Sequence, residues 1–234
     1  MVSLVNRSLT LLSNCKWVAM SARPLFSDVS NWATVILHAL VPSHQGGREV
    51  RFRSGSVLEV NSDYPFQAIA EACLLDVYYS AEFNGCVAVD VGAGVGDFVM
   101  MALRAGATRV IAFEPDPNRV LLLNRNISRN NLSGAVTVVP SNFSPEHLDA
   151  LVASLPGGTT LKLKMDCEGC EFESITKTRL DTLSRVSGIH MELHAAPTSH
   201  LAQGLVAHLR QAKFHVVLRA VGSCQYLHAY KPQP

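Results

Sequence analysis

The chain has 234 residues, of which 48% are hydrophobic and 17% are charged. This length and composition fit one compact domain with an N-terminal elaboration, and they exclude a disordered chain. The formal net charge of +1 gives no overall electrostatic attraction toward nucleic acid or a membrane surface.

The cysteines and the N-terminal sequence favour a cytoplasmic protein. The first twenty residues lack a sustained apolar run, so we predict no signal peptide, and no stretch approaches the ~20 apolar residues that span a bilayer. Cys167 and Cys170 form one C-x-x-C, without the second pair that a zinc ribbon needs and with an acidic residue that differs from a thioredoxin motif. We therefore predict six reduced thiols.

Residues 1–80 precede the regular part of the sequence and are predicted to form an N-terminal helical and hairpin cap. The expected elements are an amphipathic helix at 30–41, a hairpin of strands 50–53 and 56–60, and a helix at about 65–79. No internal repeat or low-complexity linker separates them from the rest. We expect this cap to pack on a core of residues 81–234 and to carry substrate selectivity.

The core begins with V-A-V-D-V-G-A-G-V-G-D-F at residues 87–98, a short buried strand, a glycine-rich loop and an apolar helix. The glycines at 92, 94 and 96 let the chain turn sharply and let a ligand approach the backbone closely. Glu114 comes 22 residues after Gly92, at the end of the next apolar strand. An open α/β sheet presents a carboxylate to ribose hydroxyls at that point, so the pattern predicts an adenosine-containing cofactor.

The glycine spacing and the flanking acids indicate which cofactor. Dinucleotide-binding proteins usually have G-x-G-x-x-G, with the pyrophosphate at the helix N-terminus. This chain has G-x-G-x-G between Asp90 and Asp97, and two carboxylates suit a cationic sulfonium and amino group better than a phosphate. We predict S-adenosyl-L-methionine. An NAD(P)-dependent oxidoreductase and a non-catalytic binding module on the same fold stay open, because fold alone does not establish activity.

The remaining sequence alternates strands and helices, which is typical of a parallel sheet covered on both faces. Strands are predicted at 87–91, 109–113, 135–139, 160–165, 188–193, 214–220 and 224–230. Asp116 and Pro117 are expected to begin one helix, and Gly222-Ser223 joins the last two strands as a hairpin. We predict an α/β, Rossmann-like fold with a seven-stranded, mostly parallel sheet and an antiparallel last strand.

A second group of acids follows the strand at 160–165, in the stretch K-M-D-C-E-G-C-E-F (164–172). Asp166 lies at the carboxyl end of the strand, where open α/β sheets bind ligands, and Glu168 follows closely. Glu171 opens the next short helix, where its charge suits the helix N-terminus. Lys164 stands on a strand expected to be central and therefore requires an acidic partner.

The next strand ends in H-M-E-L-H (190–194), which places His190, Glu192 and His194 on one side of the backbone. His194 is a candidate general base, since its ordinary pKa lies near neutrality, and Asp166 is the other. Asp166, Glu192 and His194 offer oxygen and imidazole ligands, but no spacing demands a metal, so no metal site is predicted.

These motifs together resemble the FkbM-like family of class I S-adenosylmethionine-dependent methyltransferases. The resemblance covers roughly residues 75–195 and is most specific in K-M-D-C-E-G-C-E, which is similar to the family's K-[IL]-D-x-E-G-x-E. Many members have asparagine where this chain has Gly94. The resemblance implies a seven-stranded methyltransferase sheet and methyl transfer to a hydroxyl oxygen of a sugar, glycan or other small molecule.

Carried over by position, the resemblance implies roles for individual residues. The glycine loop would line the methionine half of the cofactor, Glu114 would hold the ribose, and Ser141 and Asn142 would lie near the adenine. The predicted cofactor-binding set is Asp90, Gly92, Ala93, Gly94, Gly96, Asp97, Glu114, Pro115, Ser141, Asn142 and Asp166. The predicted catalytic set is Asp166, Glu168 and His194.

The expected partners follow from the same comparison of motifs. An Asn/Asp-Pro-Pro-aromatic clamp and a Pro-Cys nucleophile, common in enzymes that methylate nucleic-acid bases, are both missing from the sequence. We therefore expect a small-molecule or glycan acceptor, no nucleic acid and no membrane, with a homodimer as a compatible state.

Overall fold

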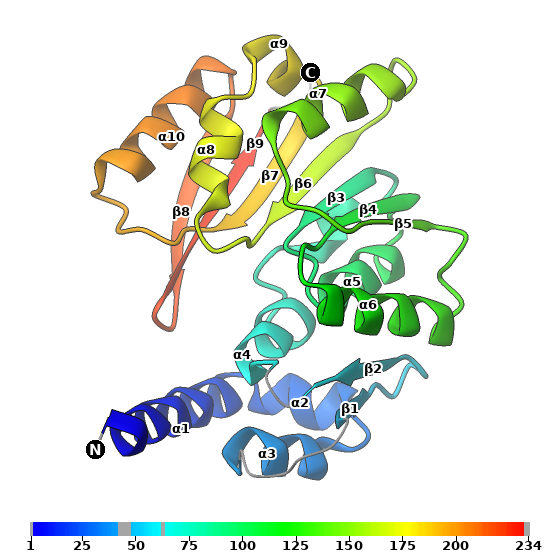
Figure 1. The fold of residues 1–234 in the computed structure, drawn as a ribbon, viewed down its shortest axis with the longest axis vertical. Coiled ribbons are helices and arrows are strands. Elements are labelled where there is room, and N and C mark those ends of the chain that lie inside the picture. Colours follow the sequence, from blue (N-terminus) through cyan, green and yellow to red (C-terminus); the bar gives the residue numbers. More distant parts are fainter. Residues whose placement is uncertain (1, 42–47, 62–63, 232–234) are drawn as a thin grey trace.

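The computed structural model describes residues 2–41, 48–61 and 64–231. A seven-stranded sheet with helices on both faces makes up the larger part, and helices α1–α3 with a small hairpin lie at one end (Figure 1). The helices are α1 (Val2–Met20), α2 (Ala22–Asp28), α3 (Trp32–Leu40), α4 (Phe66–Ile69), α5 (Asp97–Arg104), α6 (Pro117–Arg129), α7 (Pro145–Ser154), α8 (Cys170–Thr176), α9 (Leu180–Ser184) and α10 (His200–Gln211).

The strands of the main sheet are β3 (Val87–Val91), β4 (Arg109–Phe113), β5 (Val136–Val139), β6 (Leu161–Met165), β7 (Val186–Glu192), β8 (His215–Val221) and β9 (Cys224–Tyr230). Their order is β5-β4-β3-β6-β7-β9-β8. Strands β3 to β7 pair in parallel, and β9 lies antiparallel between β7 and β8. The predicted sheet is confirmed, including its antiparallel last strand. The order reverses between β3 and β6, which is where sheets of this kind bind ligands.

The local sequence explains how the elements nearest that reversal begin. Asp116 begins α6 as predicted, because its carboxylate accepts the N–H groups of Asn118 and Arg119 and Pro117 takes the first position. Gly96, with a φ of +93°, precedes α5. The start of α5 is thereby fixed directly behind the glycine loop.

The N-terminal region packs on the same apolar core as the sheet. Helix α1, which the sequence analysis did not predict, brings Trp17 into a cluster that also contains Leu25, Phe98 and Tyr226. The helix expected at 65–79 is shorter than predicted: α4 continues as a π-helical turn, η1 (Ala70–Leu74), and a 3-10 turn, η2 (Ser80–Phe83), follows. Between them Asp76 and Tyr79 have positive φ, which a continuous helix does not allow.

The predicted hairpin is confirmed as strands β1 (Arg48–Arg51) and β2 (Val57–Val60). Asn126 of α6 and Asn130, the residue directly after α6, use their side-chain amides to bond the backbone of Glu59 and Val57, each amide donating to a carbonyl and accepting an N–H at 2.7–2.9 Å. Asn31 does the same for β1, donating to the Glu49 carbonyl and accepting from the Arg51 N–H. The hairpin is thus tied to α6 on one side and to the start of α3 on the other.

Within the described residues, none of the helices combines the length and apolar character needed to cross a membrane. The division into a cap of residues 1–80 and a core of residues 81–234 stays a prediction.

Two histidines form a buried pair on β7 and β9. His190 and His228 are 2% and 7% exposed, and their Nδ1 atoms lie 2.9 Å apart. Burial, together with the neighbouring His190, lowers the pKa of His228 to about 4. The imidazole of His228 is therefore uncharged in the folded protein at neutral pH.

This pair predicts a specific loss of stability in acid. The pKa of His228 is lower in the folded chain than the ordinary value of about 6.5, so its contribution is complete above pH 6.5 and is lost as the pH falls toward 4. The free energy of unfolding, measured in urea, should fall between pH 7 and pH 4.5. We expect this fall to be smaller in His228→Asn than in the parent by on the order of 2–3 kcal/mol. The exposed variant His200→Asn should retain the parent dependence, and equal pH profiles for both variants would contradict the prediction.

Candidate functional site

The carboxyl ends of β3, β4 and β6 surround a cavity of about 250 Å³. It brings together residues that lie far apart in the sequence. Of the residues predicted from the sequence, Gly92, Gly94, Glu114, Pro115, Ser141, Asn142, Asp166 and Glu168 line this cavity. The other predicted residues do not line it: Asp90, Ala93, Gly96, Asp97 and His194.

The glycine loop is shaped by close contact with the loop after β6. Gly92 has a φ of +76°, and a Cβ there would lie 1.8 Å from the carbonyl oxygen of Asp166. The N–H of Asp166 in turn donates to the Val91 carbonyl at 2.9 Å. Any side chain at position 92 would therefore separate the two loops that form the floor of the cavity.

Glu114 is held in place by the backbone of the loops around it. Its Oε2 accepts the N–H of Gly94 at 2.8 Å, and its Oε1 accepts the N–H of Asp116 at 2.9 Å. The residue is only 2% exposed, yet it lines the cavity. Each carboxylate oxygen can accept a further hydrogen bond, so Glu114 can also receive ribose hydroxyls.

Whether an adenosine cofactor fits can be judged from the polar atoms at the cavity. The hydroxyl oxygen of Ser141 is buried and makes no hydrogen bond within the described chain, although the residue lines the cavity. Buried polar atoms normally have a hydrogen-bond partner, so this hydroxyl can bond a group that enters the cavity. The free hydroxyl, the fixed carboxylate of Glu114 and the backbone of Gly92 and Gly94 along the cavity wall together fit the predicted cofactor.

Asp90 supports the loop from below and is fully buried. Its Oδ1 lies 3.0 Å from the Nζ of Lys164, which also donates to the carbonyl of Gly92 at 3.0 Å. Burial alone would lower the pKa of Lys164, but the charges of Asp90, Asp166 and Asp97 outweigh it and raise that pKa above its ordinary value. The expectation that Lys164 needs an acidic partner is confirmed, and this partner is Asp90.

Tyr64 also lines the cavity, although no sequence motif marks it. Its hydroxyl donates to Oδ2 of Asp97 at 2.7 Å and lies 2.6 Å from the position of a Cβ at Gly94. Burial and the charge of Asp97 raise the pKa of Tyr64 well above its ordinary value, so the hydroxyl keeps its proton. Tyr64 lies thirty residues before Gly94 in a segment without a motif, and only the tertiary fold brings them together.

The predicted catalytic residues meet at the edge of the cavity. The Nε2 of His194 lies 3.7 Å from Asp166 and 3.6 Å from Glu168, whose side chain is 87% exposed. Tyr78, which is buried, donates its hydroxyl to Oδ2 of Asp166 at 3.0 Å. Asp166 is therefore oriented from one side by a phenol and faces the imidazole on the other.

His194 is anchored by the buried carboxylate of Glu171, which accepts its backbone N–H at 3.0 Å and lies 3.1 Å from its Nδ1. The hydrogen bond and charge of Glu171 raise the pKa of His194 to about 9. A histidine with that pKa already carries its proton at pH 7, which disfavours the predicted role as a general base. Glu171, expected to stabilise a helix start, has the further task of holding this cation.

Two more carboxylates, Glu71 and Glu192, lie buried behind Asp166. Burial and the charge of Glu192 raise the pKa of Glu71 to about 8. Burial and the charge of Asp166 raise the pKa of Glu192 to about 7. Both carboxyl groups therefore hold their protons to a higher pH than usual, because they are buried and lie close to other acids.

The prediction of six reduced thiols is wrong for one pair. Cys167 and Cys170 form a disulfide in the loop between β6 and α8, with their Cα atoms 5.5 Å apart. The intervening Glu168 and Gly169 both have positive φ, 56° and 108°, and this tight turn brings the two cysteines together. The cysteines at 15, 73, 86 and 224 are free.

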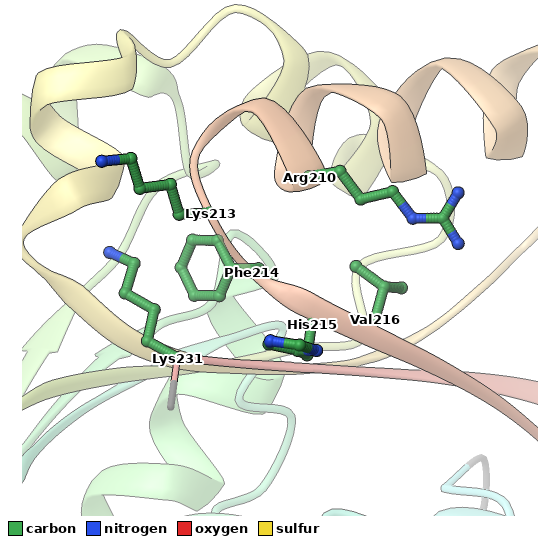
Figure 2. Close-up of a pocket in the computed structure, with 6 residues that line it drawn as sticks. All are labelled: Arg210, Lys213, Phe214, His215, Val216 and Lys231. Atoms are coloured by element: carbon green, nitrogen blue, oxygen red, sulfur yellow. The ribbon is translucent and has the colours of Figure 1, made fainter. Parts of the chain in front are cut away.

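A larger concavity, of about 720 Å³, lies where α10 ends and β8 begins (Figure 2). Arg210, Lys213, Phe214 and Lys231 surround it. Lys231 donates to the carbonyls of Leu183, Ser184 and Val186 at 2.6–2.8 Å, so its amine joins α9 to the C-terminal end of β9. No residue predicted from the sequence lies there, and the smaller cavity is the candidate site.

Comparison with known proteins supports the same class of fold. No family model matches the chain. The ribosomal protein L11 methyltransferase of Vibrio cholerae serotype O1 is 28% identical over 100 residues, which cover 42% of this chain and 34% of that protein. The histone-arginine methyltransferase CARMER of Culex quinquefasciatus is 32% identical over 82 residues, 33% of this chain and 14% of that protein. The chain spans about a third, or less, of the length of these two relatives.

Two solved structures share the architecture at low sequence identity. The precorrin-6y C5,15-methyltransferase of Geobacter metallireducens has a TM-score of 0.50 at 19% identity, over 68% of this chain and 89% of that one. The complex of aTrm5 with tRNALeu has a TM-score of 0.51 at 15% identity, over 80% of this chain and 53% of that one. The fold is that of the class I S-adenosylmethionine-dependent methyltransferases.

These findings correct the expected partners. The prediction that excluded nucleic acid is wrong, because aTrm5 carries the same fold and is named as a complex with a tRNA. Near-zero net charge and the missing base-binding motifs do not remove that class of partner. The names of these matched proteins give no support to a glycan acceptor.

The buried ion pair leads to a prediction about stability. Lys164→Met leaves the carboxylate of Asp90 buried without a counter-charge, so we expect the free energy of unfolding to fall by about 3–5 kcal/mol. The double variant Lys164→Met/Asp90→Asn removes both charges and should recover a large part of that loss. Chemical denaturation of both proteins measures the difference, and equal losses would show that the pair is not coupled.

The glycine loop gives a second prediction. Gly92→Ala places a Cβ against the Asp166 carbonyl at a positive φ, so we expect a loss of at least about 2 kcal/mol in the free energy of unfolding. Gly204→Ala, in the exposed middle of α10 with no atom near the added Cβ, should instead stabilise by about 1 kcal/mol. Urea denaturation distinguishes them, and a neutral Gly92→Ala would rule out the close contact.

Proposed function

We propose that this chain is an S-adenosylmethionine-dependent methyltransferase of the FkbM-like type, which transfers methyl groups to oxygen. The observation that carries the proposal is the meeting of three sequence motifs in one cavity: the glycine loop at Gly92, the acid Glu114 and the D-C-E-G loop at Asp166. The fold and the resemblance of K-M-D-C-E-G-C-E to the family signature support it.

Within this proposal, each part of the cavity has a separate task in binding the donor. Glu114 accepts the ribose hydroxyls, while Ser141 and Asn142 meet the adenine. The backbone of Gly92 and Gly94 borders the methionine half. Asp90 and Asp97 were assigned to the cofactor from the sequence. In this proposal they do not contact it; Asp90 binds Lys164 and Asp97 binds Tyr64, and these contacts keep the glycine loop in its conformation.

S-Adenosylmethionine supplies a methyl carbon on a sulfonium, which an acceptor oxygen takes by in-line displacement. The residues of the chain hold donor and acceptor in line and keep water from the site. Asp166 and Glu168 border the place of transfer and are the groups that take the acceptor's proton. His194, held as a cation by Glu171, balances the charge of these two carboxylates.

An acceptor on RNA or protein falls within this proposal. The matched proteins are named for ribosomal protein L11, for histone arginine and for a complex with tRNALeu. The sequence similarity of the first two to this chain extends over less than half of it. The similarity therefore supports the class of donor, while the acceptor depends on the N-terminal helices and the loops of this chain.

Calorimetry with S-adenosylhomocysteine and NAD tests the proposal. We expect S-adenosylhomocysteine to bind and NAD to show no binding. Glu114→Gln should weaken the S-adenosylhomocysteine affinity by about 1–3 kcal/mol, because a charged acceptor of the ribose hydroxyls becomes neutral. Glu173→Gln, an exposed glutamate on α8, is the matched control. Binding of NAD without S-adenosylhomocysteine would overturn the proposal in favour of an oxidoreductase.

A further inference from the structure

The acidic edge beside the cavity contains a group of side chains that face one another across two neighbouring strands. Asp166 follows β6, while Glu192 ends β7 and His194 comes two residues later. One carboxylate oxygen from each acid and one ring nitrogen of His194 all lie within 4.8 Å of one another. Two carboxylates and an imidazole at this separation form a ligand set for a divalent cation.

The ring of His194 is already oriented as a ligand, and its imidazolium would release the Nε2 proton to solvent when a cation binds there. Its Nδ1 lies 3.1 Å from the carboxylate of Glu171, and its Nε2 faces Asp166 and Glu168 at 3.7 and 3.6 Å. Histidines that bind metals in proteins usually donate the other ring N–H to a carboxylate, which fixes the tautomer and the ring orientation. Glu171 is the carboxylate that holds the Nδ1 side of the His194 ring in this way.

Glu192 provides an observation independent of the histidine. It is 8% exposed, and no N–H or O–H group of the described chain donates a hydrogen bond to its carboxylate; its one hydrogen-bond neighbour is the thiol of Cys224. A thiol is a weak donor, so this buried carboxylate lacks the partners that such groups normally have. One oxygen of this carboxylate lies within 4.8 Å of ligand atoms of both Asp166 and His194, where a cation would satisfy it.

We propose that Asp166, Glu192 and His194 bind a divalent cation at the acceptor side of the cavity. The mixed carboxylate and imidazole set favours a first-row ion such as Mn²⁺ over Mg²⁺, which prefers oxygen ligands alone. In the sequence analysis these three residues are conceivable ligands but no metal is predicted, because no spacing demands one; the proposal replaces that prediction on the strength of their measured proximity.

The chemical role of this cation rests on the proposed methyltransferase function. A cation at this position would hold an acceptor oxygen beside the donor and make its hydroxyl more acidic, acting as a Lewis acid. With Asp166 bound to the cation, Glu168, which is exposed at the rim, would take the proton alone. The chain would then prefer acceptors that offer oxygen to a metal.

Titration of Mn²⁺ into the full chain, followed by the electron paramagnetic resonance signal of free Mn²⁺, tests the site. We expect one bound ion per chain and a loss of affinity of at least about tenfold in Glu192→Gln and in His194→Gln. Glu173→Gln makes the same chemical change on the surface of α8 and should bind as the parent does. Calorimetry with S-adenosylhomocysteine on the same proteins reports on folding and on the donor site.

The outcomes distinguish the two proposals. Absence of Mn²⁺ binding up to about 1 mM, or equal binding by all three variants, overturns the cation site. If S-adenosylhomocysteine binds normally in that case, the proposed methyltransferase function is unaffected. If Mn²⁺ binds with the expected pattern while S-adenosylhomocysteine does not bind, the cation site stands and the methyltransferase proposal falls.

Discussion

The site depends on the ion pair between Lys164 and Asp90. These residues lie opposite each other in the register of β6 and β3, the two strands at which the sheet order reverses. Lys164 neutralises the acid below the glycine loop and donates to the carbonyl of Gly92 within that loop. Its positive charge also reduces the repulsion among the neighbouring acids, since Asp97 and Asp166 lie close enough to raise its pKa. A single buried cation thus allows several carboxylates to lie close together around the glycine loop.

The parts of the fold that could be predicted from the sequence are those set by local patterns. Continuous apolar runs gave the buried strands, Asp116 and Pro117 gave the start of α6, and Gly222 gave the hairpin between β8 and β9. The glycine loop and Glu114 were found because their roles depend on short, fixed spacings. Each of these patterns lies within a short, continuous stretch of the sequence.

The rest depends on contacts between distant segments, which no local pattern records. Tyr64 reaches Asp97 from the N-terminal region, and Glu171 reaches His194 from the neighbouring helix. The second contact changes the chemistry, because it turns a candidate base into a cation. The disulfide between Cys167 and Cys170 was missed for a different reason: two successive residues with positive φ bring the cysteines together, and the sequence favours that conformation only at Gly169.

The three asparagines around the small hairpin have a consequence for self-association. A two-stranded sheet usually leaves unpaired N–H and C=O groups along its outer sides, and these can recruit a strand from another molecule. Here a primary amide, which both donates and accepts as a peptide group does, occupies part of each outer side: Asn31 beside β1, and Asn126 and Asn130 beside β2. The hairpin is therefore protected against edge-to-edge aggregation by side chains, without a further strand.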